Sequence, residues 1–192
     1  LKAAYMIAGV GVLCLVDMWQ VNKRYLNDGM FVEKSVREAP QPMSHTDQLI
    51  LKDKGLDYRV LNLATNTFNE NETSYYHKSI GGYHAAKLRR YQEMIEAYIN
   101  PQMSRIMKAV ADSDGDMTRV NGDSLFPVLN MLNTKYIIVP LQGGQTVPLL
   151  NPYAYGNAWF VDRLTFADNA NQEIERIGQI DLRHEAVADK RF

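Results

Sequence analysis

The sequence has few of the residues and motifs that reveal function most directly. It has one cysteine, Cys14, in 192 residues, which excludes an internal disulfide framework and any multi-cysteine zinc site. Its 21 Lys and Arg residues are balanced by 22 Asp and Glu residues, so it has no basic field for holding DNA or RNA. The common phosphate-binding, nucleophile-elbow and zinc-protease motifs are absent. Composition therefore assigns no activity and predicts no nucleic-acid partner.

The remaining composition is that of an ordinary globular protein. Hydrophobic residues make up 46% of the chain and charged residues 22%, which argues against disorder, collagen and coiled coil. The mean hydropathy of −0.31 rules out a polytopic membrane protein for this piece of chain. The length fits one domain of about 150 residues with an appendage, or one larger domain.

Three groups of polar residues suggest chemistry, and each has a simpler interpretation. The run 112–116 resembles the start of a calcium loop, but its glycine is fourth rather than sixth. His77 and His84 flank a Gly-Gly pair and do not share one helical face. Asp162 and Asp168, on a predicted strand, need no catalytic pairing. We therefore predict no metal site, no cofactor and no catalytic residue in this chain.

The N-terminal segment differs from everything after it. Residues 3–16 form an uninterrupted run of uncharged residues, which as a helix covers about 21 Å and is too short to span roughly 30 Å of hydrocarbon. It is either a buried amphipathic helix or the tail of a transmembrane helix. Trp19, Lys23, Arg24 and Tyr25 follow it and favour the second interpretation, because such residues gather at a membrane–water interface.

These observations divide the chain into three parts. Residues 1–26 are predicted to be the remnant of a transmembrane helix, residues 27–45 a proline-bearing linker, and residues 46–192 a folded domain. In a chain isolated from lipid, residues 3–16 should pack onto their own domain or against a second copy, giving a homo-oligomer.

The patterning of the folded part predicts an α+β fold, a small mixed sheet with packed helices, preceded by the end of a membrane-type apolar helix. Ser44 or Thr46 caps a first short helix. Strands 58–63, 136–139 and 159–164 form one sheet with 136–139 at its centre, because that run is apolar on both faces. Long loops are expected at 65–82 and 142–152. The expected later elements are helices 83–100, 101–112, 125–132 and 171–180, the last capped by Asn169 or Asn171, and a strand at 185–189.

One dense constellation, residues 74–90, gathers tyrosines, histidines and cations around a Gly-Gly pair. It is either a tyrosine-rich loop before a solvated basic helix face, or a weak anion site. In the second interpretation the glycines and the start of a helix meet a lipid phosphate, headgroup or sugar. The candidate binding residues are Tyr75, Tyr76, His77, Lys78, Gly81, Gly82, Tyr83, His84, Lys87 and Arg90.

Several blocks of the chain, in their order and spacing, resemble a known family. They read DYRVLNL, TSYYHKSIGGYHAAKLRRYQE, VLNMLNTKYIIV and GNAWFVD, and an upstream piece reads DMWQVNKRYLND. From Asp17 to Phe192 the chain resembles the extracytoplasmic part of YfhO-type bacterial membrane proteins, most closely the large members found in Bacteroidetes. In that family the upstream piece ends the last helix of a multi-pass membrane region.

The resemblance implies a parent protein with a GT-C-like membrane core, which moves sugars from polyprenyl-phosphate carriers onto cell-envelope acceptors. It implies that residues 46–192 are an extracytoplasmic domain, continued beyond Phe192 in the family, and that the catalytic carboxylate lies in an early loop outside this chain. The expected function is thus a non-catalytic domain of a membrane glycosyltransferase at the cell membrane, with the transmembrane region, membrane headgroups or a polyprenyl-phosphate sugar as partners. The alternatives are an interaction or scaffold domain of an envelope protein without enzymatic activity, and, least favoured, a free soluble enzyme.

Overall fold

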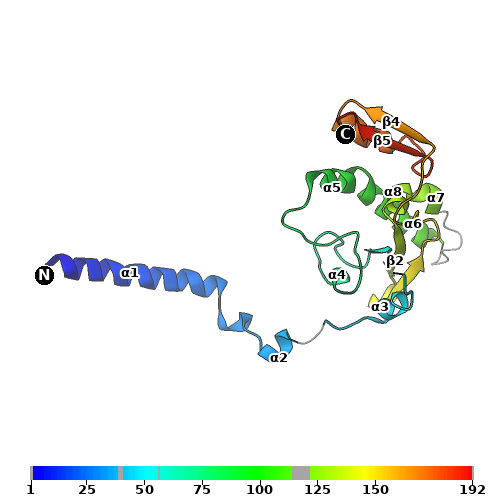
Figure 1. Ribbon diagram of the computed structural model, residues 1–192. Coiled ribbons are helices and arrows are strands. Elements are labelled where there is room, and N and C mark those ends of the chain that lie inside the picture. The colour runs from blue at the N-terminus through cyan, green and yellow to red at the C-terminus, as the bar shows by residue number, and fades with distance from the viewer. Residues whose placement is uncertain (1, 39–40, 56, 114–121, 192) are drawn as a thin grey trace. The chain divides into compact units, whose positions relative to one another are not determined.

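A computed structural model describes residues 2–38, 41–55, 57–113 and 122–191 (Figure 1). The chain divides into two compact units, residues 1–42 and 43–192, and each is described by itself. The first holds α1 (Lys2–Tyr25), η1 (Asp28–Met30) and α2 (Lys34–Arg37). The second holds, in order, α3 (His45–Ile50), β1 (Arg59–Asn62), α4 (Thr73–Tyr76), α5 (Arg89–Met94), η2 (Ile95–Ile99), α6 (Asn100–Asp112), α7 (Gly122–Leu125), α8 (Pro127–Met131), β2 (Thr134–Pro140), η4 (Gln142–Gly144), β3 (Thr146–Leu150), β4 (Arg163–Ala167), α9 (Ala170–Ile177) and β5 (Glu185–Asp189).

The first unit is dominated by α1, a single helix of 24 residues without a buried side chain (Figure 1). The apolar run 3–16 is too short to span by itself, but the helix continues past Asp17 and reaches about 36 Å. The segment Lys2–Met30 is long and apolar enough to cross a membrane, by length and composition.

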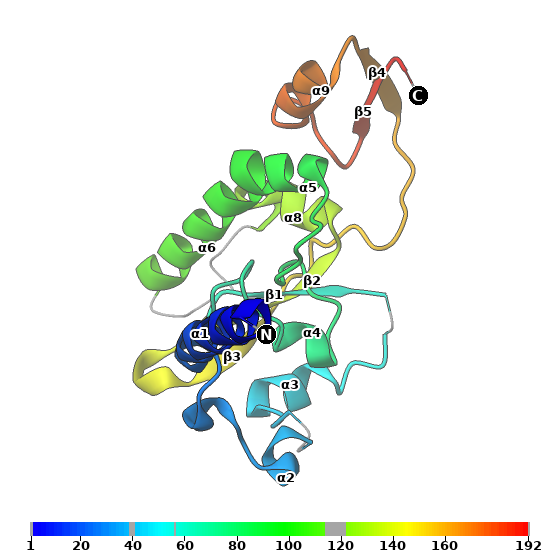
Figure 2. The same ribbon diagram turned by 90° about the vertical axis from the view of Figure 1, so that its left-hand side faces the viewer.

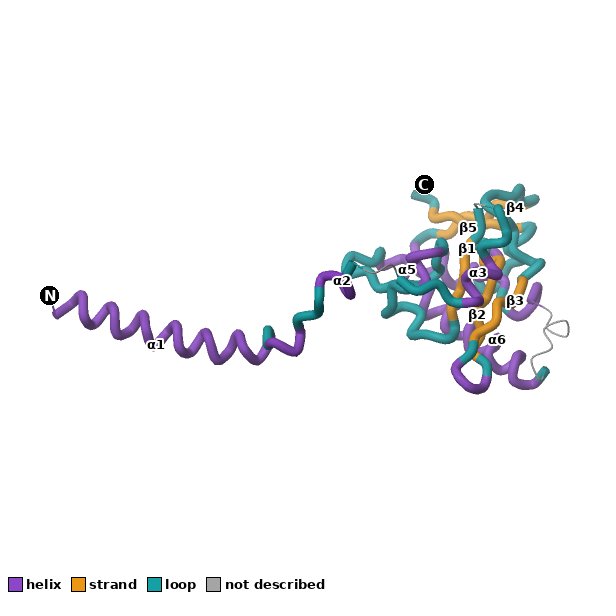
Figure 3. Tube along the Cα trace, turned by 90° about the horizontal axis from the view of Figure 1, so that it is seen from below, coloured by secondary structure: helices purple, strands orange, loops and turns teal. Residues whose placement is uncertain are grey.

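The second unit has the predicted α+β architecture, built on a small mixed sheet of order β1-β2-β3 (Figure 3). Strand β2 pairs with β1 in parallel and with β3 antiparallel. The prediction that residues 136–139 form the central strand is confirmed. The parallel pairing forces a long crossover between β1 and β2, and the segment 74–90 lies within it.

Helices cover both faces of this sheet (Figure 2). On one face Leu61 and Ile137 pack into the larger core, which also contains buried residues of η2, α6 and α8. On the other face Val60 and Ile138 pack against Ile50 of α3. Alternate residues of the same strands thus enter two different cores, as side chains that alternate across a sheet must.

The third strand of the sheet is not the predicted one. Strand β3 lies in the segment 142–152, which we expected to be a loop because it contains glycine and proline. Gly143 and Gly144, with φ of 80° and 78°, instead reverse the chain into a hairpin with β2. Only the last two residues of the other predicted strand, 159–164, lie in β4 (Arg163–Ala167), which pairs with β5 in a separate parallel sheet joined by α9.

The helix boundaries also differ from those expected. The helix predicted from residue 83 begins only at Arg89, and α5, η2 and α6 follow one another without a break at Pro101. A π turn lies directly before the proline, where the N–H of Asn100 donates to the carbonyl of Ile95. This wider turn accommodates a residue that normally breaks an α-helix. The predicted helix 125–132 is divided at Phe126 into α7 and α8.

The helix caps follow the sequence closely. Ser44 caps α3 and forms a capping box with Asp47, and Asn169 caps α9 by accepting the N–H of Gln172. Both satisfy backbone donors that a helix N-terminus leaves unpaired. The last predicted strand, 185–189, is β5.

The two-sided burial of β2 generates a stability prediction. Ile137 is 1% exposed in the larger core, so Ile137→Ala should lower the free energy of unfolding by about 2–4 kcal/mol through cavity formation. The matched control is Leu150→Ala on β3, where the side chain is exposed and the loss should stay below about 0.5 kcal/mol. Urea unfolding of the detergent-solubilised chain, followed by near-UV circular dichroism, measures both. A loss below about 1 kcal/mol for Ile137→Ala would place β2 outside a packed core.

Candidate functional site

The ten residues singled out by the sequence are spread over α4, the loop after it and the start of α5. Tyr75 and Tyr76 end α4, and Arg90 lies in the first turn of α5. Lys78 lines a small hollow with Asp57, whereas Arg90 lines a separate one. Among the described residues, Lys78 and Arg90 thus line two different hollows.

The Gly81–Gly82 pair serves a close backbone contact. A Cβ on Gly81 would lie 1.9 Å from the carbonyl oxygen of Thr67, and Gly82 has a φ of +108°, which favours glycine. The N–H of Gly81 donates to Ser79 Oγ at 3.0 Å, and that of Gly82 to the Thr67 carbonyl at 2.7 Å. Both donors are thus committed internally, and the helix expected to begin here begins at Arg89. The structural premise of a glycine-and-helix anion cradle was wrong.

The charged side chains of the segment are paired with other polar groups. Lys78 Nζ lies 3.6 Å from Asp57 Oδ1, and Arg90 Nη2 donates to Glu173 Oε2 at 2.9 Å. His84 Nδ1 accepts the backbone N–H two residues further on at 3.1 Å. These pairs are exposed and add little stability, but they reduce the positive charge offered to an anion.

Not all the aromatic side chains of the segment are exposed to solvent. Tyr75 and Tyr83 are exposed, and the Tyr75 ring meets that of Tyr76 edge-on with centroids 5.0 Å apart. Lys87 Nζ lies 5.3 Å from the centre of the Phe68 ring. Binding of a lipid phosphate, headgroup or sugar by this segment stays a prediction, which rests on its side chains and not on the glycine backbone.

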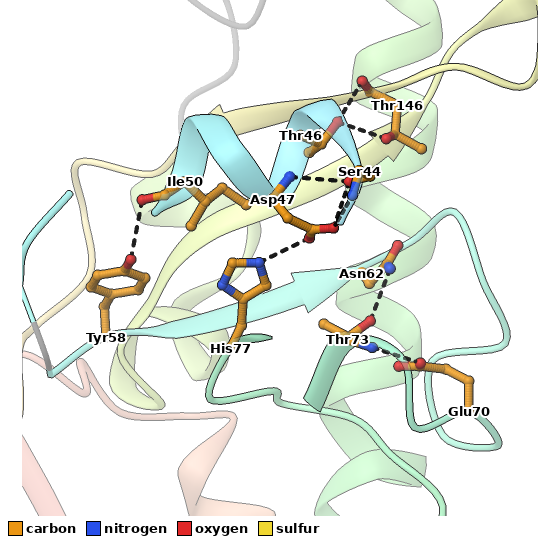
Figure 4. Close-up of polar contacts among 10 residues, drawn as sticks. All are labelled: Ser44, Thr46, Asp47, Ile50, Tyr58, Asn62, Glu70, Thr73, His77 and Thr146. Atoms are coloured by element: carbon orange, nitrogen blue, oxygen red, sulfur yellow. Dashed lines mark hydrogen bonds and ion pairs between the residues drawn. The ribbon is translucent and has the colours of Figure 1, made fainter. Parts of the chain in front are cut away.

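His77 has a structural position that the sequence did not reveal (Figure 4). Its side chain is 1% exposed, and Nε2 lies 2.9 Å from Asp47 Oδ1. The other carboxylate oxygen of Asp47 accepts the N–H and hydroxyl of Ser44 in the capping box. Burial alone would raise the pKa of Asp47, but the hydrogen bonds from Ser44 and His77 outweigh it and lower that pKa. The pair fastens α3 to the chain that follows α4.

Threonines extend the same network to the sheet (Figure 4). The Thr46 hydroxyl donates to the carbonyl of Thr146 at 2.7 Å and so joins α3 to β3. Asn62 Nδ2 donates to Thr73 Oγ1 at 2.9 Å, and the Thr73 N–H donates to Glu70 Oε2 at 3.0 Å. These bonds join β1 to α4, so the polar cluster around α3 and α4 organises the fold.

A second cluster surrounds Asp53. Its Oδ2 accepts from Lys135 Nζ at 2.5 Å and from the Tyr136 hydroxyl at 2.9 Å. The Lys135 hydrogen bond, with those of the Gly55 N–H and Tyr136, lowers the pKa of Asp53 to about 2. Burial and the neighbouring carboxylate raise the pKa of Tyr136 to about 12. A perturbed pKa marks a candidate functional group, but here both groups hold the turn after α3 against β2.

No metal site emerges from the part of the chain that the structure describes, because none of its residues form a group of three or more His, Cys, Asp or Glu side chains placed to hold an ion. His77 pairs with Asp47 and not with His84. The calcium-like run 112–116 lies largely outside the described residues. Asp162 and Asp168 do not pair with each other, since Asp162 contacts His184 and Asp168 contacts Lys190.

A feature that sequence reasoning missed lies at the other end of the unit. A cleft is lined by Tyr155, Trp159, Phe160, Asp162, Arg183 and His184. The density of aromatic residues between positions 153 and 160 was the available indication, but we interpreted Trp159 and Phe160 as the start of a strand. Arg183 and His184 reach the cleft because the chain before β5 pairs with the chain before β4. There the N–H groups of Asp162 and Arg163 donate to the carbonyl of His184.

Comparison of the chain with family models, with curated proteins and with solved structures finds no match.

The Asp53 cluster predicts a pH dependence of stability. The folded-state pKa of Asp53 lies below its ordinary value, so its contribution is present above about pH 4 and is lost as the pH falls toward 2. Asp53→Asn should lower the urea midpoint at pH 7 and flatten its decline between about pH 5 and 2. Asp57→Asn is the matched control, because that carboxylate is exposed and lies 3.6 Å from Lys78. If the urea midpoint of Asp53→Asn fell with pH as steeply as that of the wild type, the stabilising role assigned to the Asp53 carboxylate would be contradicted.

The glycine pair predicts a second stability difference. Gly81→Ala should destabilise the protein by about 1–3 kcal/mol or more, because its Cβ would overlap the Thr67 backbone. Gly143→Ala is the control, since its Cβ meets nothing within 4 Å and only its positive φ adds a cost of about 1 kcal/mol. Thermal unfolding ranks the two variants. If Gly81→Ala is as stable as wild type, the close contact with Thr67 does not exist.

Proposed function

We propose that this chain is a membrane-anchored, non-catalytic domain of a multi-pass, GT-C-like glycosyltransferase of the cell envelope. In this proposal residues 43–192 lie on the extracytoplasmic side and help to shape the donor or acceptor site at the membrane face. The observation that carries the proposal is α1, an apolar helix without a buried residue. Removing one such Leu or Val side chain from water gains about 1.5–3 kcal/mol, and lipid provides that gain.

The C-terminal end of α1 supports an interfacial position. Trp19, Lys23, Arg24 and Tyr25 occupy its last two turns, and Lys23 Nζ lies 5.7 Å from the Trp19 ring centre. Aromatic and basic residues of this kind mark the level of the lipid headgroups. The folded unit would then follow a short linker from the membrane surface.

The polar groups of the folded unit support a non-catalytic role. Two of the carboxylates with lowered pKa values serve the fold: Asp47 accepts hydrogen bonds from Ser44 and His77, and Asp53 accepts one from Lys135. A catalytic site needs a nucleophile or acid placed toward a substrate cavity, whereas these two carboxylates are engaged in contacts within the fold. This observation equally favours the second candidate, an interaction or scaffold domain without sugar chemistry, and binding of a sugar would separate the two.

The extracytoplasmic side has a consequence for the parent protein. Lys23, Arg24, Lys34 and Arg37 follow the apolar segment. By the positive-inside rule, cations in this position favour a cytoplasmic folded unit when no other part of the protein sets the orientation. The proposed side therefore depends on the further membrane spans that the resemblance to YfhO-type proteins implies.

Membrane fractionation tests the anchor. The chain should sediment with bacterial membranes and resist extraction by carbonate at high pH, and deletion of residues 2–26 should release it into the soluble fraction. Leu13→Ala, which keeps most of the apolar surface, should remain bound as a control. Release of the intact chain by carbonate would contradict an integral α1.

Cysteine labelling tests the side of the membrane. In a Cys14→Ala background, Leu150→Cys gives one exposed thiol. In spheroplasts that express the complete reading frame, a membrane-impermeant maleimide should label this thiol before lysis, because the folded unit faces outward. Labelling only after lysis would place the unit in the cytoplasm and overturn the proposed side.

A further inference from the structure

The cleft between residues 155–162 and the turn before β5 combines aromatic and polar groups in the manner of a ligand site. Its volume is about 240 Å³. It lies apart from the segment 74–90, none of whose residues line it. Of the side chains that line it, Tyr155 also packs against the larger core.

The aromatic wall of the cleft is fixed in place on one side and open on the other. The rings of Tyr155 and Trp159 meet edge-on with centroids 5.1 Å apart, and Trp159 Nε1 donates to the carbonyl of Leu182 at 3.1 Å. Phe160 beside them is fully exposed. Phe160 thus offers an exposed ring beside a half-buried, oriented indole, and both side chains line the cleft.

The polar wall carries charges that largely balance one another. His184 Nδ1 lies 2.8 Å from Asp162 Oδ2, and the Arg183 guanidinium lies 5.4 Å from the centre of the Tyr155 ring. A bound ammonium group would be repelled by Arg183, and a bound phosphate would meet the carboxylate of Asp162. A neutral ligand rich in hydroxyl groups avoids both penalties and can use all three side chains as donors or acceptors.

We propose that this cleft binds a neutral pyranose ring of a glycan. The C–H face of the sugar packs on Trp159 and Phe160, as apolar atoms pack on aromatic faces. Its hydroxyl groups exchange hydrogen bonds with Asp162, Arg183 and His184. The inference rests on the proposed function in assigning a sugar ligand to this domain, and it places that ligand at a site distinct from residues 74–90.

Tryptophan fluorescence tests the proposal, because the chain has two tryptophans and Trp19→Phe leaves Trp159 as the reporter. The full chain is kept in a zwitterionic detergent, since sugar-based detergents would compete. The probes are the methyl glycosides of glucose, galactose, mannose and N-acetylglucosamine. At least one should change the fluorescence in a saturable way with a dissociation constant in the millimolar range, as expected for so small a ligand.

Two variants localise the binding. Phe160→Ala removes a fully exposed ring, so it should leave the fold intact and weaken binding at least about fivefold. Phe166→Ala on β4 removes a ring that is also exposed, outside the cleft, and should leave the affinity unchanged. A tryptophan signal that both variants weaken equally would overturn the proposal.

Other outcomes also overturn it. If none of the four glycosides gives a saturable response at concentrations up to about 50 mM, the cleft holds no pyranose. A response to inorganic phosphate alone would assign an anion to it. Either result leaves the carbonate fractionation of α1 unaffected, so the sugar site and the membrane anchor fail independently.

Discussion

Burial of strand β2 on both faces is the constraint on which the folded unit depends. Ile137 enters the core beneath η2, α6 and α8, and Ile138 enters the core beneath α3. Helices must therefore lie on both sides of the sheet, and the parallel partner β1 requires a long crossover. That crossover contains residues 74–90, held to β1 by the bridge between Val60 and Ser79. The dense constellation of the sequence lies where it does because of this topology.

The same constraint explains why many charges of the unit are structural. A crossover without long helices before Arg89 must satisfy its backbone by other contacts, and the N–H groups of Gly81 and Gly82 do so by donating to Ser79 Oγ and to the Thr67 carbonyl. The His77–Asp47 pair adds a side-chain contact to α3. Lys135, at the start of β2, is in turn fixed by Asp53. Polar residues that lie close together in the sequence thus make contacts in different parts of the fold. The cleft at residues 155–162, away from the central sheet, combines exposed aromatic and charged groups.

The sequence predicted the elements that depend on local chemistry. The caps at Ser44 and Asn169, the central apolar strand and the last strand are as expected, because each follows from residue type and short-range periodicity. The errors involve strand pairing: the glycines and proline of segment 142–152 predicted a loop, but Gly143 and Gly144 allow a hairpin that places β3 on β2. For the candidate site, the aromatic run before β4 was visible, but Arg183 and His184 reach it only through tertiary structure.

The central claim is that α1 resides in lipid while residues 43–192 fold as a separate unit on β2. Hydrogen exchange of the chain in lipid nanodiscs, followed by mass spectrometry, measures both parts in one experiment. The account predicts strong protection of amides in residues 4–16, comparable to that of β2, and weak protection across the linker at 27–38. Rapid exchange throughout residues 4–16 in nanodiscs, with β2 still protected, would contradict a membrane-embedded α1 and with it the proposed function.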